Sequence, residues 1–168
     1  MSRACACRTL RRDERGSVML ETCIAFVTVV AGFVCLCQLA DLYVHELIVS
    51  RAASAAARAA VVVLPDDGAH YGDPTQRTLH RFVGARKAAV EAAARAVLQA
   101  SSSFAPDASV TLAGERRAGA LLTARVAVRY GCSLRIWNPV CGSAGSRVLR
   151  ASASLPYQSA AYDYPVGG

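Results

Sequence analysis

Residues 11–40 read RRDERGSVMLETCIAFVTVVAGFVCLCQLA, a basic stretch followed by a long apolar run. From Thr22 to Ala40 the only strongly polar side chain is that of Gln38. Residues 17–40 would form a helix of roughly 36 Å at ~1.5 Å per residue, enough to cross a hydrocarbon core of ~30 Å. No other stretch of the 168 residues is comparably long and apolar. The sequence therefore predicts one transmembrane helix, residues 17–40.

The N-terminal segment 1–16 carries five arginines and two acidic residues. Basic side chains beside a membrane helix are retained in the cytoplasm, so we expect the N-terminus there and the rest of the chain on the other side. A removable secretory signal peptide is the alternative, but its apolar core is only ~7–15 residues long. The run here is longer, and a helical pattern continues beyond Asp41, which favours a retained anchor.

Glu21 places a carboxylate near the start of the membrane helix, five residues after Gly16. An acidic side chain inside a bilayer costs free energy, and such residues usually have a function. The helix dipole favours a negative charge near the N-terminus, which offsets part of that cost. A glutamate that merely reaches back to the lipid head groups is the alternative interpretation.

Beyond the membrane, residues 41–64 are expected to continue the helix as an amphipathic segment that ends at Pro65. Small or apolar side chains recur every three to four residues, together with one histidine: Leu42, His45, Leu47 or Ile48, Ala52, Ala55 or Ala56, and Ala59. A face made mostly of such small side chains predicts close packing against a sheet or other helices. His45 itself, just outside the membrane, is expected to be exposed.

Residues 65–168 are expected to form an exported α+β domain. Asp73-Pro74-Thr75-Gln76 is typical of a helix start and predicts a second helix over 74–102. After Pro106 the apolar period changes to two, which predicts strands between 108 and 155 in a small antiparallel sheet, one face covered by a helix. The tail 157–168, rich in Tyr, Gly and Pro, is expected to be extended or mobile.

Of the seven cysteines, only Cys132 and Cys141 lie in the expected exported part. An isolated pair in a compartment that permits disulfides most simply forms one bridge, so we predict that they are linked. A metal site would need further ligands nearby, and the sequence shows none.

Charge and motifs exclude several classes of function. The net charge of +7 falls to about +4 without residues 1–16, and the remaining charges look scattered, without the basic stripe and aromatics of a nucleic-acid-binding protein. His45-Glu46 lacks the second histidine of a zinc protease motif, and Gly142–Gly145 lacks the spacing of a nucleophile elbow. We therefore expect no enzyme, no cofactor and no nucleic-acid partner.

Three segments together resemble the TadE/TadF-like minor pilins, or pseudopilins, of the tight-adherence (Flp) type IV pilus system. They are the leader and first turn Arg15–Glu21, the membrane exit Ala40–Val44 followed by the Ala/Arg-rich helix Ser50–Ala60, and the last strand Leu149–Tyr157. The chain departs from related families at two positions. Type IV pilins usually have Phe where this chain has Ser17, and Flp major pilins tend to have Tyr where it has Thr22. Both differences point to a minor component.

The resemblance implies a pilin-like fold and a role in pilus assembly. A membrane prepilin peptidase would cut between Gly16 and Ser17, and Glu21 would then pair with the new amine of Ser17 in the same or a neighbouring subunit. Implied partners are that peptidase, other minor and major pilins, the inner-membrane assembly platform and membrane lipid. The protein would cross the inner membrane once and then initiate or cap a pilus. The alternative is an uncleaved single-pass membrane protein with an extracytoplasmic binding domain.

Overall fold

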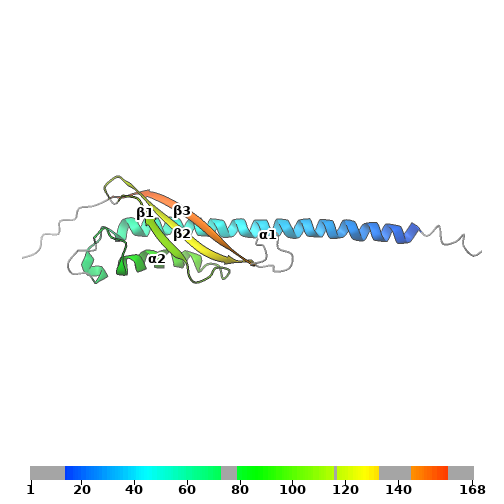
Figure 1. Ribbon diagram of the computed structural model, residues 1–168, viewed down its shortest axis with the longest axis horizontal. Helices are drawn as coiled ribbons and strands as arrows, with labels where there is room; N and C mark the ends of the chain where they lie inside the picture. The colour runs from blue at the N-terminus through cyan, green and yellow to red at the C-terminus, as the bar shows by residue number, and fades with distance from the viewer. Residues whose placement is uncertain (1–13, 73–78, 116, 133–144, 159–168) are drawn as a thin grey trace, which may run out of the picture. The chain divides into compact units, whose positions relative to one another are not determined.

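The computed structural model describes residues 14–72, 79–115, 117–132 and 145–158. Its elements are α1 (Glu14–Val63), the 3-10 helix η2 (Gly68–Tyr71), α2 (Gly84–Leu98), β1 (Ser109–Ala113), β2 (Leu121–Gly131) and β3 (Ser146–Pro156). This is the predicted α+β class: a long helix, a second helix and then an antiparallel sheet (Figure 1). The chain divides into two compact units between Ala40 and Asp41.

The first unit contains the apolar part of α1. Among the described residues this is the one helix long and apolar enough to cross a membrane, and only 6% of its most apolar window is buried. Most of its large apolar side chains from Val18 to Leu39 are exposed, as expected of a helix that faces lipid and not of a core helix, whereas Gln38 is buried. The hydroxyls of Thr22 and Thr28 donate to carbonyls four residues earlier, so they need no water.

In the second unit, the rest of α1 buries a stripe of small side chains. The fully buried positions are Ala52, Ala53, Ala56, Ala57 and Ala60, with Val49 and Leu64 at the two ends. The predicted stripe was close to this one, but Leu47 is half exposed and Val49 takes its place. Alanine leaves the helix backbone close to whatever covers it, and a sheet provides a suitable flat surface.

The sheet has the order β1-β2-β3, and both pairs are antiparallel. Alternate residues of β2, from Leu122 to Tyr130, are buried, as the period of two predicted. They form one core with the alanine face of α1 and with Val90, Ala94 and Leu98 of α2. In Figure 1 the strands and α2 lie alongside the second half of α1.

The predicted start of the second helix was wrong. Residues 79–83 form turn and coil, and α2 begins at Gly84 after Val83, which provides no side-chain cap. His80 adopts a positive φ of 60° in this turn. Its backbone N–H donates a hydrogen bond of 2.9 Å to the carbonyl of Leu64, just after the end of α1. The proposed cap at Asp73 lies outside the described residues. The helix also ends at Leu98, before the predicted residue 102.

The tail 157–168 was expected to be extended or mobile, and this prediction is wrong for its first residue, Tyr157. Its side chain is fully buried, and its N–H bonds to Ala120 O at 2.7 Å. Its hydroxyl is 2.6 Å from Nδ1 of His80. The chain is therefore fixed through Tyr157, whereas residues 159–168 lie outside the described part.

Cys132, which directly follows β2, is disulfide-bonded. Its predicted partner, Cys141, lies outside the described residues, so the pairing stays a prediction. Cys23, Cys35 and Cys37 on the apolar part of α1 are free thiols.

Candidate functional site

Glu21 lies on the exposed surface of the apolar helix. It is the only charged side chain between Val18 and Ala40, and no described residue forms an ion pair or hydrogen bond with its carboxylate. A carboxylate in that position can accept hydrogen bonds or pair with a cation from outside this chain. Within the described part of the chain, the carboxylate of Glu21 therefore has no partner.

Gly16 and Ser17 lie within the first turns of α1, because the helix begins at Glu14 and not at the expected residue 17. Two consequences follow. Ser17 and Glu21 are four residues apart in one helix, so they share a face one turn apart. A peptidase that cuts after Gly16 would have to unwind the helix start, where backbone N–H groups lack helical partners and Gly disfavours helix by ~1 kcal/mol.

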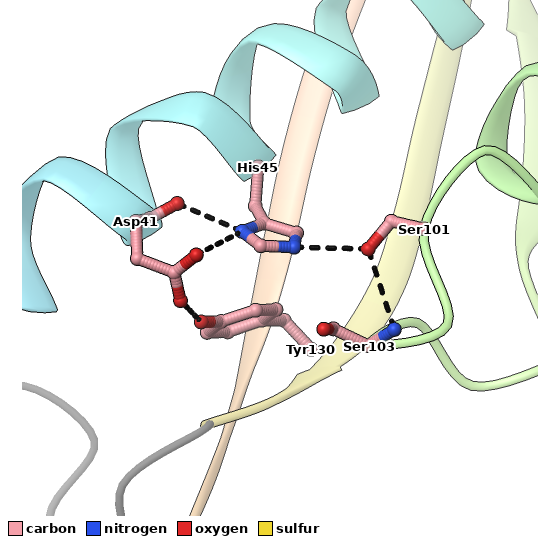
Figure 2. Close-up of polar contacts among 5 residues, drawn as sticks. All are labelled: Asp41, His45, Ser101, Ser103 and Tyr130. Atoms are coloured by element: carbon pink, nitrogen blue, oxygen red, sulfur yellow. Dashed lines mark hydrogen bonds and ion pairs between the residues drawn. The ribbon is translucent and has the colours of Figure 1, made fainter.

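A second polar site lies inside the folded unit, where three elements meet (Figure 2). It comprises Asp41 and His45 on α1, Ser101 just after α2, and Tyr130 near the end of β2. His45 is only 7% exposed and lies against two aromatic rings. Its ring centroid is 4.5 Å from that of Tyr130 and 5.3 Å from that of Phe104.

The hydrogen bonds indicate that Nδ1 of the His45 ring carries a proton. Nδ1 is 2.7 Å from the backbone carbonyl of Asp41, which can only accept, so Nδ1 carries a proton. When the ring is neutral, Nε2 accepts a hydrogen bond from the hydroxyl of Ser101, whose Oγ is 3.0 Å away. The hydroxyl of Tyr130 donates a hydrogen bond to Oδ2 of Asp41. The buried polar groups thus satisfy one another across α1, β2 and the segment after α2.

Asp41, His45 and Ser101 occur in the order of an acyl-transfer triad, but the contacts differ from those of one. The shorter contact of Nδ1 is with a backbone carbonyl, since the nearest carboxylate oxygen of Asp41 is 3.4 Å away. The N–H of Ser103 donates to Ser101 Oγ at 3.3 Å, so it is not free to stabilise an oxyanion. We interpret the cluster as a structural link that joins the membrane-proximal part of α1 to the sheet.

Comparison of the chain with models of protein families, with curated proteins and with solved structures found no match. In the described part of the chain, no group of three His, Cys, Asp or Glu side chains could hold a metal ion.

Arg86 organises the end of α1. Its side chain is 1% exposed and donates to the carbonyls of Leu64 and Asp66, the latter at 2.8 Å. Its guanidinium lies 5.3 Å from the ring centroid of Tyr71. Partial burial raises the pKa of the Tyr71 hydroxyl, and Asp66 raises it further, so Tyr71 stays neutral and donates to the Asp66 carboxylate at 3.2 Å. A cation at the C-terminal end of a helix also complements its dipole.

The expectation that His45 is exposed was wrong. The helical periodicity does predict its burial, because a histidine three residues after Leu42 and four before Val49 lies on the same buried face. Its partners could not be found in this way, since Ser101 is 56 residues from His45 and Tyr130 is 89 from Asp41. Ser17 and Glu21 lie on α1 as predicted, whereas Gly16, expected in the leader, also lies on α1; all three belong to the other unit.

Replacing His45 by alanine is expected to lower the free energy of unfolding by roughly 2–3 kcal/mol, because the change removes a packed ring and leaves buried polar groups unpaired. Glu46→Ala, at the exposed next position of the same helix, is the matched control. Thermal unfolding in neutral detergent measures both. Equal stability of the two variants would contradict the structural role of the cluster.

Proposed function

We propose that the protein is a minor pilin or pseudopilin of the tight-adherence type. In this proposal it has no catalytic activity and no cofactor. A prepilin peptidase removes residues 1–16, the apolar part of α1 holds the subunit in the inner membrane, and the subunit then joins other pilins at the start or tip of a pilus. The basic segment 1–16 supports a cytoplasmic N-terminus and an extracytoplasmic sheet domain.

One observation carries the proposal: a single 50-residue helix has two surfaces of different kinds. Its first part exposes large apolar side chains and one carboxylate, Glu21, whereas its second part buries alanines beneath an antiparallel sheet. A membrane anchor alone needs only the apolar side chains. The carboxylate costs free energy in lipid, so its presence favours an additional role in subunit contacts.

Cleavage supplies the partner that this carboxylate lacks. The new α-amino group of Ser17 has a pKa near ~8 and is largely a cation at neutral pH. Because Ser17 precedes Glu21 by one helical turn, the two charges can pair within one subunit, or across two subunits that are staggered along their helices. Pairing across subunits would set the register as helices stack.

Processing tests the proposal. Co-expression with a prepilin peptidase is expected to shorten the chain by residues 1–16, and Gly16→Val is expected to block this. A β-branched side chain stiffens the backbone that must enter the protease cleft. Gly32→Val is the control, since it makes the same change in the same helix at a position where a Cβ meets nothing within 4 Å.

Electrophoretic mobility and intact mass report the cut. The expected result is cleavage of the parent chain and of Gly32→Val, with Gly16→Val left intact. If the peptidase leaves all three chains uncut, the proposal fails, and an uncleaved single-pass protein with a binding domain explains the structure better.

A further inference from the structure

The outer face of the sheet gathers arginines that looked scattered in the sequence. In β2, the buried positions alternate with Arg125 and Arg129, which are both exposed. In β3, Arg150 pairs with Ala127, the residue between them. Arg125 and Arg129 are four residues apart, roughly 13 Å at ~3.3 Å per residue, and Arg150 reaches the same face midway. The three arginines therefore occupy positions around Ala127 on the same face of the sheet.

These arginines have no acidic partner in the described part of the chain. The three strands contain no aspartate or glutamate, and no described residue forms an ion pair with Arg125, Arg129 or Arg150. The contrast is with α2, where Lys87 and Arg95 both reach Glu91. Three like charges placed close together repel one another, so an anion bound among them would relieve that repulsion.

Hydroxyl groups surround the arginines. The outward-facing positions of the strands include Ser109, Thr111, Thr123, Ser152 and Ser154. A shallow depression of ≈ 590 Å³ lies here, lined by Arg125 and Arg150 together with Ser109, Thr111 and Ser152. Such a surface offers forked donors for carboxylates beside hydroxyls that both donate and accept.

The composition of this face argues against nucleic acid as its occupant. Its outward-facing positions carry no aromatic side chain, because Tyr130 of β2 lies on the buried face, whereas single-stranded nucleic acids stack their bases on aromatic rings. Three arginines would also neutralise few phosphates of a duplex. A chain of sugars that carries both carboxylates and hydroxyls matches both kinds of group on the face.

We propose that the outer face of the sheet binds an acidic polysaccharide, with Arg125, Arg129 and Arg150 pairing with its carboxylates and the neighbouring hydroxyls contacting its sugar rings. This proposal does not depend on cleavage of residues 1–16.

Binding of polygalacturonate to the full chain in neutral detergent, near physiological ionic strength, tests the proposal. The variant R125Q/R129Q/R150Q is expected to bind about tenfold more weakly or worse, because three charge-assisted contacts are lost. The control R51Q/R58Q/R117Q removes the same charge from exposed arginines elsewhere and is expected to bind like the parent. Thermal unfolding of each variant verifies that all are folded.

Two further probes separate the ligand classes. Fully methyl-esterified polygalacturonate has the same sugar chain without its charges and is expected not to bind. A short DNA duplex is expected to bind more weakly than polygalacturonate. The proposal is overturned if polygalacturonate does not bind, if the two triple variants bind it equally, if the ester binds as well, or if the duplex binds more tightly.

Discussion

Replacing Glu21 by alanine is expected to leave the protein in the membrane and to remove it from the pilus. Loss of an intramembrane carboxylate makes insertion more favourable by up to ~2.5–3.5 kcal/mol, so anchoring should be unchanged or better. Cleavage after Gly16 should also continue, because the scissile bond is untouched. Association with other pilins should fall, since the amine of Ser17 loses its counter-charge.

Three measurements on this variant separate assembly from anchoring: the membrane-bound fraction, the intact mass of the chain, and the amount of surface pili with co-purified pilins. Glu21→Gln is expected to behave like Glu21→Ala, because it keeps the shape and loses the charge. Cys23→Ala, an exposed neighbour in the same helix, is the control. Normal piliation by Glu21→Ala would show that the carboxylate has no assembly role.

Replacing Arg86 by methionine is expected to lower the free energy of unfolding by roughly 3 kcal/mol, since two charge-assisted hydrogen bonds to carbonyls at the end of α1 are lost. For a domain of this size the unfolding temperature should fall by roughly 10 °C. Arg86→Lys should recover only part of the loss, because one ammonium cannot reproduce the guanidinium fork to Leu64 and Asp66.

Arg95→Met is the matched control on the same helix. Arg95 is exposed and pairs only with Glu91, so its replacement should cost less than about 1 kcal/mol. Thermal unfolding followed by near-ultraviolet circular dichroism reports the loss of packing. Equal unfolding temperatures for Arg86→Met and Arg95→Met would contradict the role assigned to Arg86.

Local patterns predicted the elements well. The apolar period of two predicted strands between 108 and 155, because a strand with one buried face must alternate. β1 and β2 lie within that range, and β3 ends one residue beyond it. An apolar run followed by small residues at helical spacing predicted one helix ending near Pro65, and α1 ends at Val63. These predictions needed only neighbours in the sequence.

Most of the misses share one cause, which is that distant residues decide them; the burial of His45 is the exception, because its helical spacing already places it on the buried face. Residues 79–83 follow a helix-start signature but form turn and coil, and in that turn the N–H of His80 bonds to the end of α1. Arg86 is charged yet buried, and it donates to carbonyls about twenty residues earlier in the chain. The arginine face depends on the pairing register of β2 and β3. None of these partners follows from composition or periodicity.

The N-terminus of the natural membrane-bound protein tests the central claim most directly. Intact mass and terminal peptides of the chain purified from its own membranes would show whether residues 1–16 are present. The account predicts a chain that begins at Ser17, with its amine one helical turn from Glu21. A chain that keeps Met1 to Gly16 would contradict the assignment as a processed pilin.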